Sequence, residues 1–165
     1  MSNQLRKLVV FYSLEGNTRL MASAIAAASG ADLLELKPEQ DINPQGFMKF
    51  FWGGRQVMTK KAPPLLPLAK DPADYELLFI GTPVWAFSFA PALNTFFHTS
   101  EIKGKKVALF CCHEGGRGKT FENMRRELAG NEIIGEIDFI APRKKGMVDE
   151  NEEKARKWAE ALVRP

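Results

Sequence analysis

The fold of this chain is decided near its start, by the stretch Leu8-Val9-Val10-Phe11-Tyr12-Ser13-Leu14-Glu15-Gly16-Asn17-Thr18. Its first five residues form a continuous apolar run, which predicts a strand buried on both faces of a sheet. A short polar loop follows, and apolar residues then recur at helical spacing as far as Gly30, which supplies a stop signal. The stretch therefore predicts a strand, a loop and a helix in succession.

The same alternation continues along the chain. We expect five strands, separated by helices, over residues 8–12, 32–36, 77–81, 107–111 and 133–140. Such alternation predicts an α/β fold in which helices cover both faces of a parallel sheet, a three-layer α/β/α sandwich. The second and fifth strands mix charged with apolar residues, which is typical of sheet edges. The predicted strand order is therefore 2-1-3-4-5, within a single domain that spans 1–165.

Composition limits the possible functions. The formal charge is +3, far from the charge density of a nucleic-acid binder, and basic groups such as Arg143-Lys144-Lys145 are interpreted as solvated loop ends. No apolar run approaches the roughly 20 residues that cross a bilayer. Residues 1–7 lack the apolar core of a signal peptide, so we expect a cytoplasmic protein. With two adjacent cysteines and two histidines, no metal site is expected.

The loops after the first, third and fourth strands are the ones to examine for a ligand. Sheets of this order bind ligands beyond the carboxyl ends of their strands, where the winding direction reverses. The first loop opens a helix, whose unpaired N–H groups and positive end favour an anion. Ser13 and Thr18 add hydroxyl donors, and no lysine is present as in nucleoside-triphosphate loops. The loop suits a terminal phosphomonoester, and the alternative is a plain helix N-cap.

The pattern Tyr12-Ser13-x-x-Gly16-Asn17-Thr18 resembles the phosphate loop of flavodoxins and flavodoxin-like reductases. The resemblance extends over nearly the whole chain and implies a flavodoxin-like fold that holds one FMN. It places the ribityl phosphate of FMN on Ser13, Leu14, Glu15, Gly16, Asn17 and Thr18. Glu15 departs from the family, in which threonine or serine is more usual. A carboxylate beside a phosphate costs energy unless it points to solvent.

The resemblance also assigns the other two loops to the flavin ring. The second loop would line the isoalloxazine with Pro83, Val84, Trp85, Ala86 and Phe87, although Trp85 and Phe87 could instead be core residues. The third loop would close over the pyrimidine end with Cys112, His113, Gly115, Gly116 and Gly118. The alternative for His113 is a solvent-facing position. For the pair Cys111-Cys112, a small buried strand end and thiol redox chemistry both remain open.

An aromatic segment, residues 47–52, has three interpretations. It could cover the edge of the flavin, belong to the core, or form the surface of a homodimer if it is exposed.

Two functions remain open at this point. The first is an FMN-dependent oxidoreductase that uses NAD(P)H or a quinone-type partner. The second is a non-enzymatic electron carrier that docks on a redox partner protein. Carrier flavodoxins are strongly acidic as a family and dock through complementary charge, whereas this chain is slightly basic, which favours the oxidoreductase. Because the flavin carries the chemistry in both cases, no catalytic side chain is predicted.

Overall fold

The computed structural model describes residues 4–41 and 62–165, so the aromatic segment 47–52 lies outside the described residues. The parallel sheet contains the strands β1 (Lys7–Phe11), β2 (Asp32–Glu35), β3 (Leu77–Trp85), β5 (Lys106–His113) and β6 (Glu132–Ile140). Their order across the sheet is β2-β1-β3-β5-β6, which confirms the order predicted from the sequence. A two-residue strand, β4 (Ser88–Phe89), pairs antiparallel with the end of β3.

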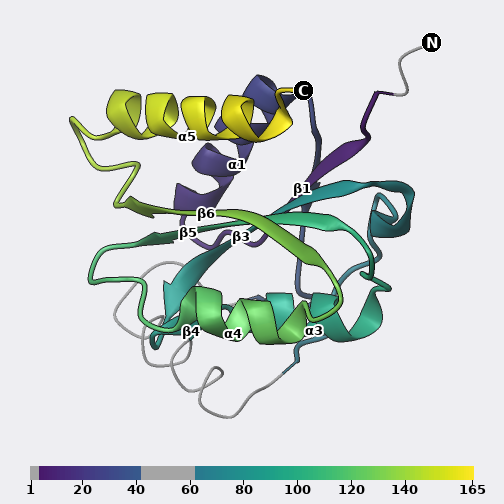
Figure 1. The fold of residues 1–165 in the computed structure, drawn as a ribbon. Coiled ribbons are helices and arrows are strands. Elements are labelled where there is room, and N and C mark those ends of the chain that lie inside the picture. Colours follow the sequence, from purple (N-terminus) through teal and green to yellow (C-terminus); the bar gives the residue numbers. More distant parts are fainter. Residues whose placement is uncertain (1–3, 42–61) are drawn as a thin grey trace.

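Helices cover both faces of this sheet (Figure 1). On one face lie α1 (Asn17–Ser29) and α5 (Val148–Val163), and on the other lie α3 (Pro91–Thr99) and α4 (Thr120–Glu127). A single-turn 3-10 helix, η1 (Pro72–Asp74), precedes β3. The predicted three-layer sandwich is therefore confirmed. In the described part of the chain, no helix has the length and apolar character needed to cross a membrane.

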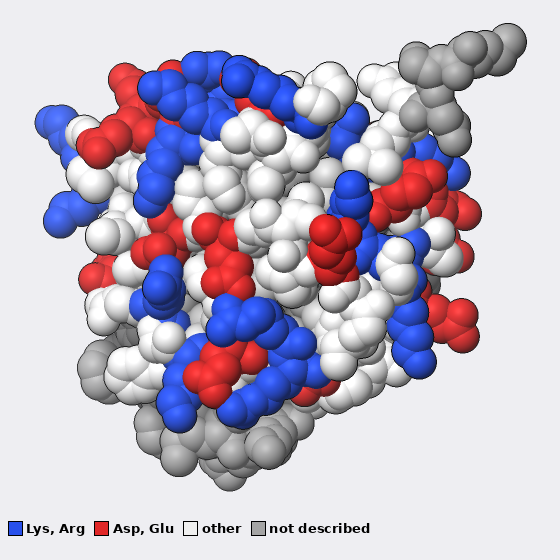
Figure 2. Space-filling model, viewed as in Figure 1, with Lys and Arg blue, Asp and Glu red and all other residues white. Residues whose placement is uncertain are grey.

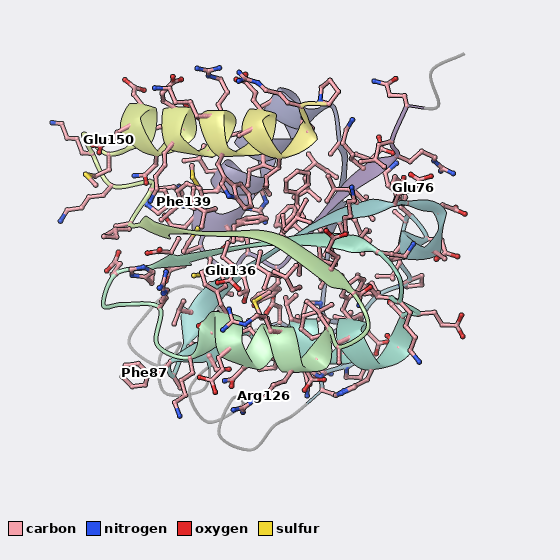
Figure 3. All side chains as sticks on the ribbon, in the orientation of Figure 1. Glu76, Phe87, Arg126, Glu136, Phe139 and Glu150 are labelled. Carbon is pink, nitrogen blue, oxygen red and sulfur yellow. The ribbon has the colours of Figure 1, made fainter. Side chains whose placement is uncertain are left out.

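Each face of the sheet has its own core, because side chains alternate along a strand. In β1, Val9 and Phe11 pack toward α1 and α5, whereas Leu8 and Val10 pack toward α3 and α4. Phe139 of β6 is likewise buried in the layer beneath α5 (Figure 3). Both faces of the central strands are covered, which is why β1 shows a continuous apolar run instead of an alternating one.

One carboxylate in each edge strand pairs with an arginine of a neighbouring helix. Glu35 of β2 forms an ion pair with Arg19 of α1, and Glu136 of β6 forms one with Arg125 of α4. On the face shown in Figure 2, positive and negative side chains are interleaved. The edge positions of β2 and β6 therefore let these carboxylates stay partly solvated and paired, as their composition predicted.

The strand β3 is longer than the predicted strand 77–81. Residues 82–85 were expected in a loop, but residues 82 and 83 continue the pairing with Cys111 and Cys112 of β5, and residues 84 and 85 pair with β4. Proline lacks an N–H donor, and it is tolerated here because β1 has already ended beside Gly81. The second loop is therefore the end of a strand followed by a tight turn into β4.

Strand register brings the three loops to one edge of the sheet. Phe11 of β1 lies opposite Gly81 of β3, which in turn lies opposite Phe110 of β5. Because the three strands are parallel, the first loop (residues 13–18), the second (82–87) and the third (112–118) leave the sheet side by side.

We expect Gly81→Ala to lower the free energy of unfolding by about 1–3 kcal/mol, the usual cost of overpacking a core. A Cβ at Gly81 would overlap the ring of Phe110, which is fully buried. Urea unfolding followed by circular dichroism measures the change. Gly115→Ala is the control, since a Cβ there meets nothing within 4 Å. Equal stabilities for the two variants would contradict the prediction.

Candidate functional site

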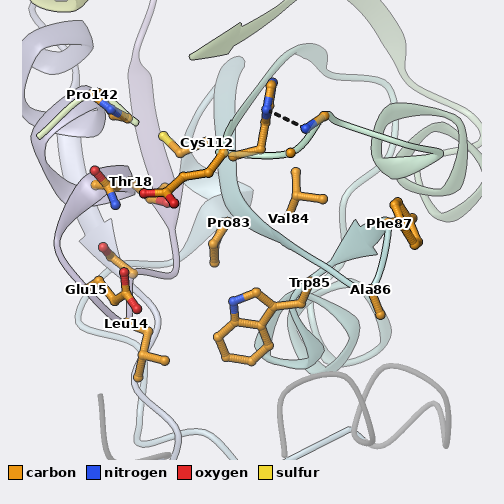
Figure 4. A pocket seen from close by; sticks show the side chains of 16 residues that line it. Leu14, Glu15, Thr18, Pro83, Val84, Trp85, Ala86, Phe87, Cys112 and Pro142 are labelled. Atoms are coloured by element: carbon orange, nitrogen blue, oxygen red, sulfur yellow. Dashed lines mark hydrogen bonds between the residues drawn. The ribbon is translucent and has the colours of Figure 1, made fainter. Parts of the chain in front are cut away.

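A cavity of about 390 Å³ opens where the three loops meet (Figure 4). This volume is typical of sites for small molecules and cofactors. Glu114 and Pro142 line it, although they were not predicted. Gly16 and Gly118 were predicted but do not line it. All the other predicted site residues do: Ser13, Leu14, Glu15, Asn17, Thr18, Pro83, Val84, Trp85, Ala86, Phe87, Cys112, His113, Gly115 and Gly116.

Ser13 caps the first helix from within the first loop. Its Oγ accepts hydrogen bonds from the backbone N–H groups of Gly16 at 3.1 Å and Arg19 at 3.2 Å. Capping was the alternative to anion binding, but the two roles are compatible. A hydroxyl that accepts two hydrogen bonds still has its own proton to donate.

Thr18 presents a buried hydroxyl beside the Cys112 thiol, at the edge of the cavity. Its Oγ1 has no oxygen or nitrogen partner within the described part of the chain. The backbone N–H groups of Asn17 and Thr18 belong to the first turn of α1, where no carbonyl one turn back is available. A buried unsatisfied group costs about 1–3 kcal/mol. The start of α1 therefore offers several donors to a ligand that carries oxygen acceptors.

Arg143, from the loop between β6 and α5, contacts the first loop from outside. Its backbone N–H donates to Asn17 Oδ1 at 3.1 Å, and its Nη1 donates to the carbonyl oxygen of Glu15. The Glu15 side chain is exposed, as an anion site requires of a carboxylate. Arg143 was not predicted. Its position just after the carboxyl end of the last strand, at the ligand-binding edge, is the signal that could have identified it.

Trp85, at the end of β3, both lines the cavity and packs against the core. Its ring meets Tyr12 edge to face, with ring centroids 5.5 Å apart and planes at 89°. Tyr12 is itself fixed, because its hydroxyl donates to Asp41 Oδ1 at 2.7 Å. Burial, reinforced by Asp41, raises the pKa of Tyr12 far above its ordinary value, so the phenol stays protonated. Trp85 is thus a rigid wall of the cavity.

Ala86 and Phe87 form a two-residue turn between β3 and β4, with φ angles of 47° and 64°. Glycine and asparagine are usual at such positions, because a side chain is strained there. Phe87 is 70% exposed and points away from the sheet (Figure 3), so its interpretation as a core residue is wrong. Its carbonyl accepts a hydrogen bond from the Lys119 N–H at 2.9 Å. Gly118 is required beside it, since a Cβ there would lie 2.6 Å from the Phe87 Cβ.

His113, at the end of β5, is held from two sides. The Gly116 N–H donates to Nδ1 at 3.0 Å, and Nε2 lies 2.7 Å from Asp138 Oδ2. Because Nδ1 accepts, the proton of the neutral ring is on Nε2, which donates to the carboxylate. Burial by itself would raise the pKa of Asp138. His113, with Lys154 and Arg117, outweighs that effect and holds this pKa below its usual range. The His113 side chain is only 8% exposed, so the solvent-facing alternative is wrong.

The family of proteins described as flavodoxin matches residues 6–160 of this chain. The chain belongs to the flavodoxin family. Its fold is similar to that of a flavoprotein from Lactobacillus acidophilus in complex with FMN, with a TM-score of 0.70, 23% identity, and coverage of 88% of this chain and 97% of that one. The TM-score is 0.65 with a WrbA-like flavodoxin from Agrobacterium tumefaciens, at 16% identity over 96% of this chain and 95% of that one. Membership confirms the predicted family and supports FMN as its cofactor.

In this flavodoxin-family chain the two adjacent cysteines lie at the buried end of β5. Both thiols are free and buried, and burial raises the pKa of Cys112 to about 12 and that of Cys111 further. The thiolate is the reactive form of cysteine, and neither side chain forms it near neutral pH. Cys111 packs toward α3 and α4, whereas Cys112 packs toward α1 and α5.

Within the described residues, no cluster of His, Cys, Asp and Glu could hold a metal ion.

We expect Ala86→Gly to raise the free energy of unfolding by about 1 kcal/mol, because glycine adopts a positive φ without strain. The matched control is Ala27→Gly, on the exposed side of α1. There the same replacement should lower stability by about 1 kcal/mol. Thermal or urea unfolding measures both variants. A similar loss of stability in the two would contradict the strained geometry of the turn.

Proposed function

We propose that this chain binds one FMN in the cavity and acts as an FMN-dependent oxidoreductase with NAD(P)H or a quinone-type partner. The binding part depends above all on one observation, the buried Thr18 Oγ1 in the cavity lining, which has no oxygen or nitrogen partner among the described residues. A ligand oxygen at that position would remove the cost of leaving the hydroxyl unsatisfied. The FMN complex of the Lactobacillus acidophilus protein supports the choice of ligand.

The first loop suits the phosphate end of FMN. The hydroxyl protons of Ser13 and Thr18 and the first amides of α1 are all donors, and the positive end of the helix favours an anion. Hydrogen bonds to a charged group contribute about 1.5–3 kcal/mol each. This arrangement would favour the phosphorylated flavin over riboflavin.

The second and third loops suit the ring end. Trp85 presents an aromatic surface beside the apolar Pro83 and Val84, and aromatic contacts add about 0.5–1.5 kcal/mol beyond surface burial. His113 fixes the Gly116 amide, so the third loop offers an ordered backbone to the polar edge of a ring. When bound, FMN supplies the hydride and electron chemistry, while the protein supplies binding, orientation and electrostatic tuning.

The choice of oxidoreductase over carrier depends on charge. With a formal charge of +3, the protein lacks the excess of acidic residues through which a carrier would dock on a basic reductase. One observation favours the carrier instead. Phe87 is exposed at the edge of the cavity, and it offers an apolar contact that a docked protein would cover.

We expect Ser13→Ala and Thr18→Ala each to raise the Kd for FMN about tenfold to a hundredfold, through loss of a hydrogen bond to a charged group. Quenching of flavin fluorescence on titration of the apoprotein measures the affinity. Thr120→Ala is the matched control, since Thr120 Oγ1 is also buried and unpartnered among the described residues but lies outside the cavity lining. Unchanged affinity in both loop variants would place the phosphate elsewhere.

We expect the FMN-loaded protein to oxidise NADH or NADPH through many turnovers when a quinone or a dye is the acceptor. The loss of absorbance at the nicotinamide band gives the rate, and the apoprotein is the control. If no acceptor supports turnover, while light-driven reduction of the bound FMN proceeds cleanly in two steps, the carrier is the correct function.

A further inference from the structure

Arg143 joins two loops that are distant in sequence. It lies in the loop after β6, and it bonds to the first loop through both its backbone and its side chain. The backbone N–H donates to Asn17 Oδ1 at 3.1 Å, and Nη1 donates to the Glu15 carbonyl oxygen. These two bonds bracket Gly16, the residue at which the first loop turns into α1.

Gly16 lies directly against the Arg143 side chain. Its φ of 96° is a conformation that side-chain-bearing residues rarely adopt, and a Cβ at this position would lie 2.9 Å from Arg143 Nη1. The guanidinium therefore occupies the space that a side chain at residue 16 would take. Gly16 does not line the cavity, so among the described residues the neighbour that a side chain there would meet is Arg143.

The positive charge of Arg143 lies next to the first loop, at the backbone of Glu15. The guanidinium donates to the Glu15 backbone carbonyl, which is a neutral acceptor, so this bond leaves the guanidinium charge intact. The other arginine at this end of α1, Arg19, pairs with Glu35 through its side chain. Glu15 is the acidic residue of the first loop, and a carboxylate there opposes the binding of a second anion.

We propose that Arg143 is a positioning residue for the phosphate of FMN. It holds the first loop in its anion-binding conformation, and its charge offsets that of Glu15. This inference rests on the proposed binding of FMN by the first loop.

The test measures the affinity of the apoprotein for FMN and for riboflavin, which lacks the phosphate. We expect Arg143→Ala to raise the Kd for FMN about tenfold or more, as expected for a charge-assisted contact. Riboflavin affinity should stay within about twofold of wild type, because riboflavin carries no phosphate for the first loop to bind. Lys144→Ala is the control, because this neighbouring side chain is also an exposed cation.

Two further variants separate conformation from charge. Arg143→Gln keeps a side-chain donor but removes the charge, so its dependence of log Kd on salt should be flatter than that of wild type. In a Glu15→Gln background, Arg143→Ala should cost less affinity than in wild type, because there is no carboxylate to offset. Amide exchange across residues 15–19 of the apoprotein should be faster in Arg143→Ala than in Lys144→Ala.

The outcomes are distinguishable. If wild type binds no FMN, the proposed function fails. If wild type binds FMN but Arg143→Ala and Lys144→Ala behave alike, the role of Arg143 is overturned while FMN binding stands. An equal loss of affinity in the presence and absence of Glu15 would overturn the charge offset, and unchanged amide exchange would overturn the conformational part.

Discussion

Parallel pairing of β1, β3 and β5 is the constraint on which the rest of this protein depends. The register that sets Phe11 beside Gly81 and Gly81 beside Phe110 ends the three strands at one edge of the sheet. A slip of one residue would turn every buried side chain of a strand toward the opposite face, so the two hydrophobic cores hold the register. The cavity exists because three loops leave that edge together.

Each of these loops is then held by a residue from another element. Arg143 of the β6–α5 loop holds the first loop, the Lys119 amide holds the strained turn at Phe87, and Asp138 of β6 holds His113 of the third. A site whose loops are fixed before a ligand arrives spends less free energy on ordering them when it binds. The strain at the turn is tolerated because the surrounding contacts over-determine its conformation.

The sequence was sufficient to predict the strand order and most of the cavity lining. It was insufficient where the conformation is set by contacts with distant residues and not by the local residue pattern. Residues 82–85 were expected in the loop after the third predicted strand, yet pairing with β5 as far as Pro83, and then with β4, extends the strand. The turn at Ala86 and Phe87 carries none of the glycine or asparagine that marks a tight hairpin, so β4 had no signal. Phe87 was considered as core on its chemistry alone, but the turn directs it to solvent.

What the sequence by itself determined is what neighbouring residues encode: the buried strands, the helix that follows the first loop, and the hydroxyls and glycine of residues 13–18. Those features depend on backbone preferences and on periodicity, which act over a few residues. Only the tertiary structure decided that Arg143 reaches Glu15, 128 positions away, and that Asp138 fixes the proton of His113. Such contacts depend on where β6 ends relative to β1 and β5, and that position is set by the packing of the whole sheet.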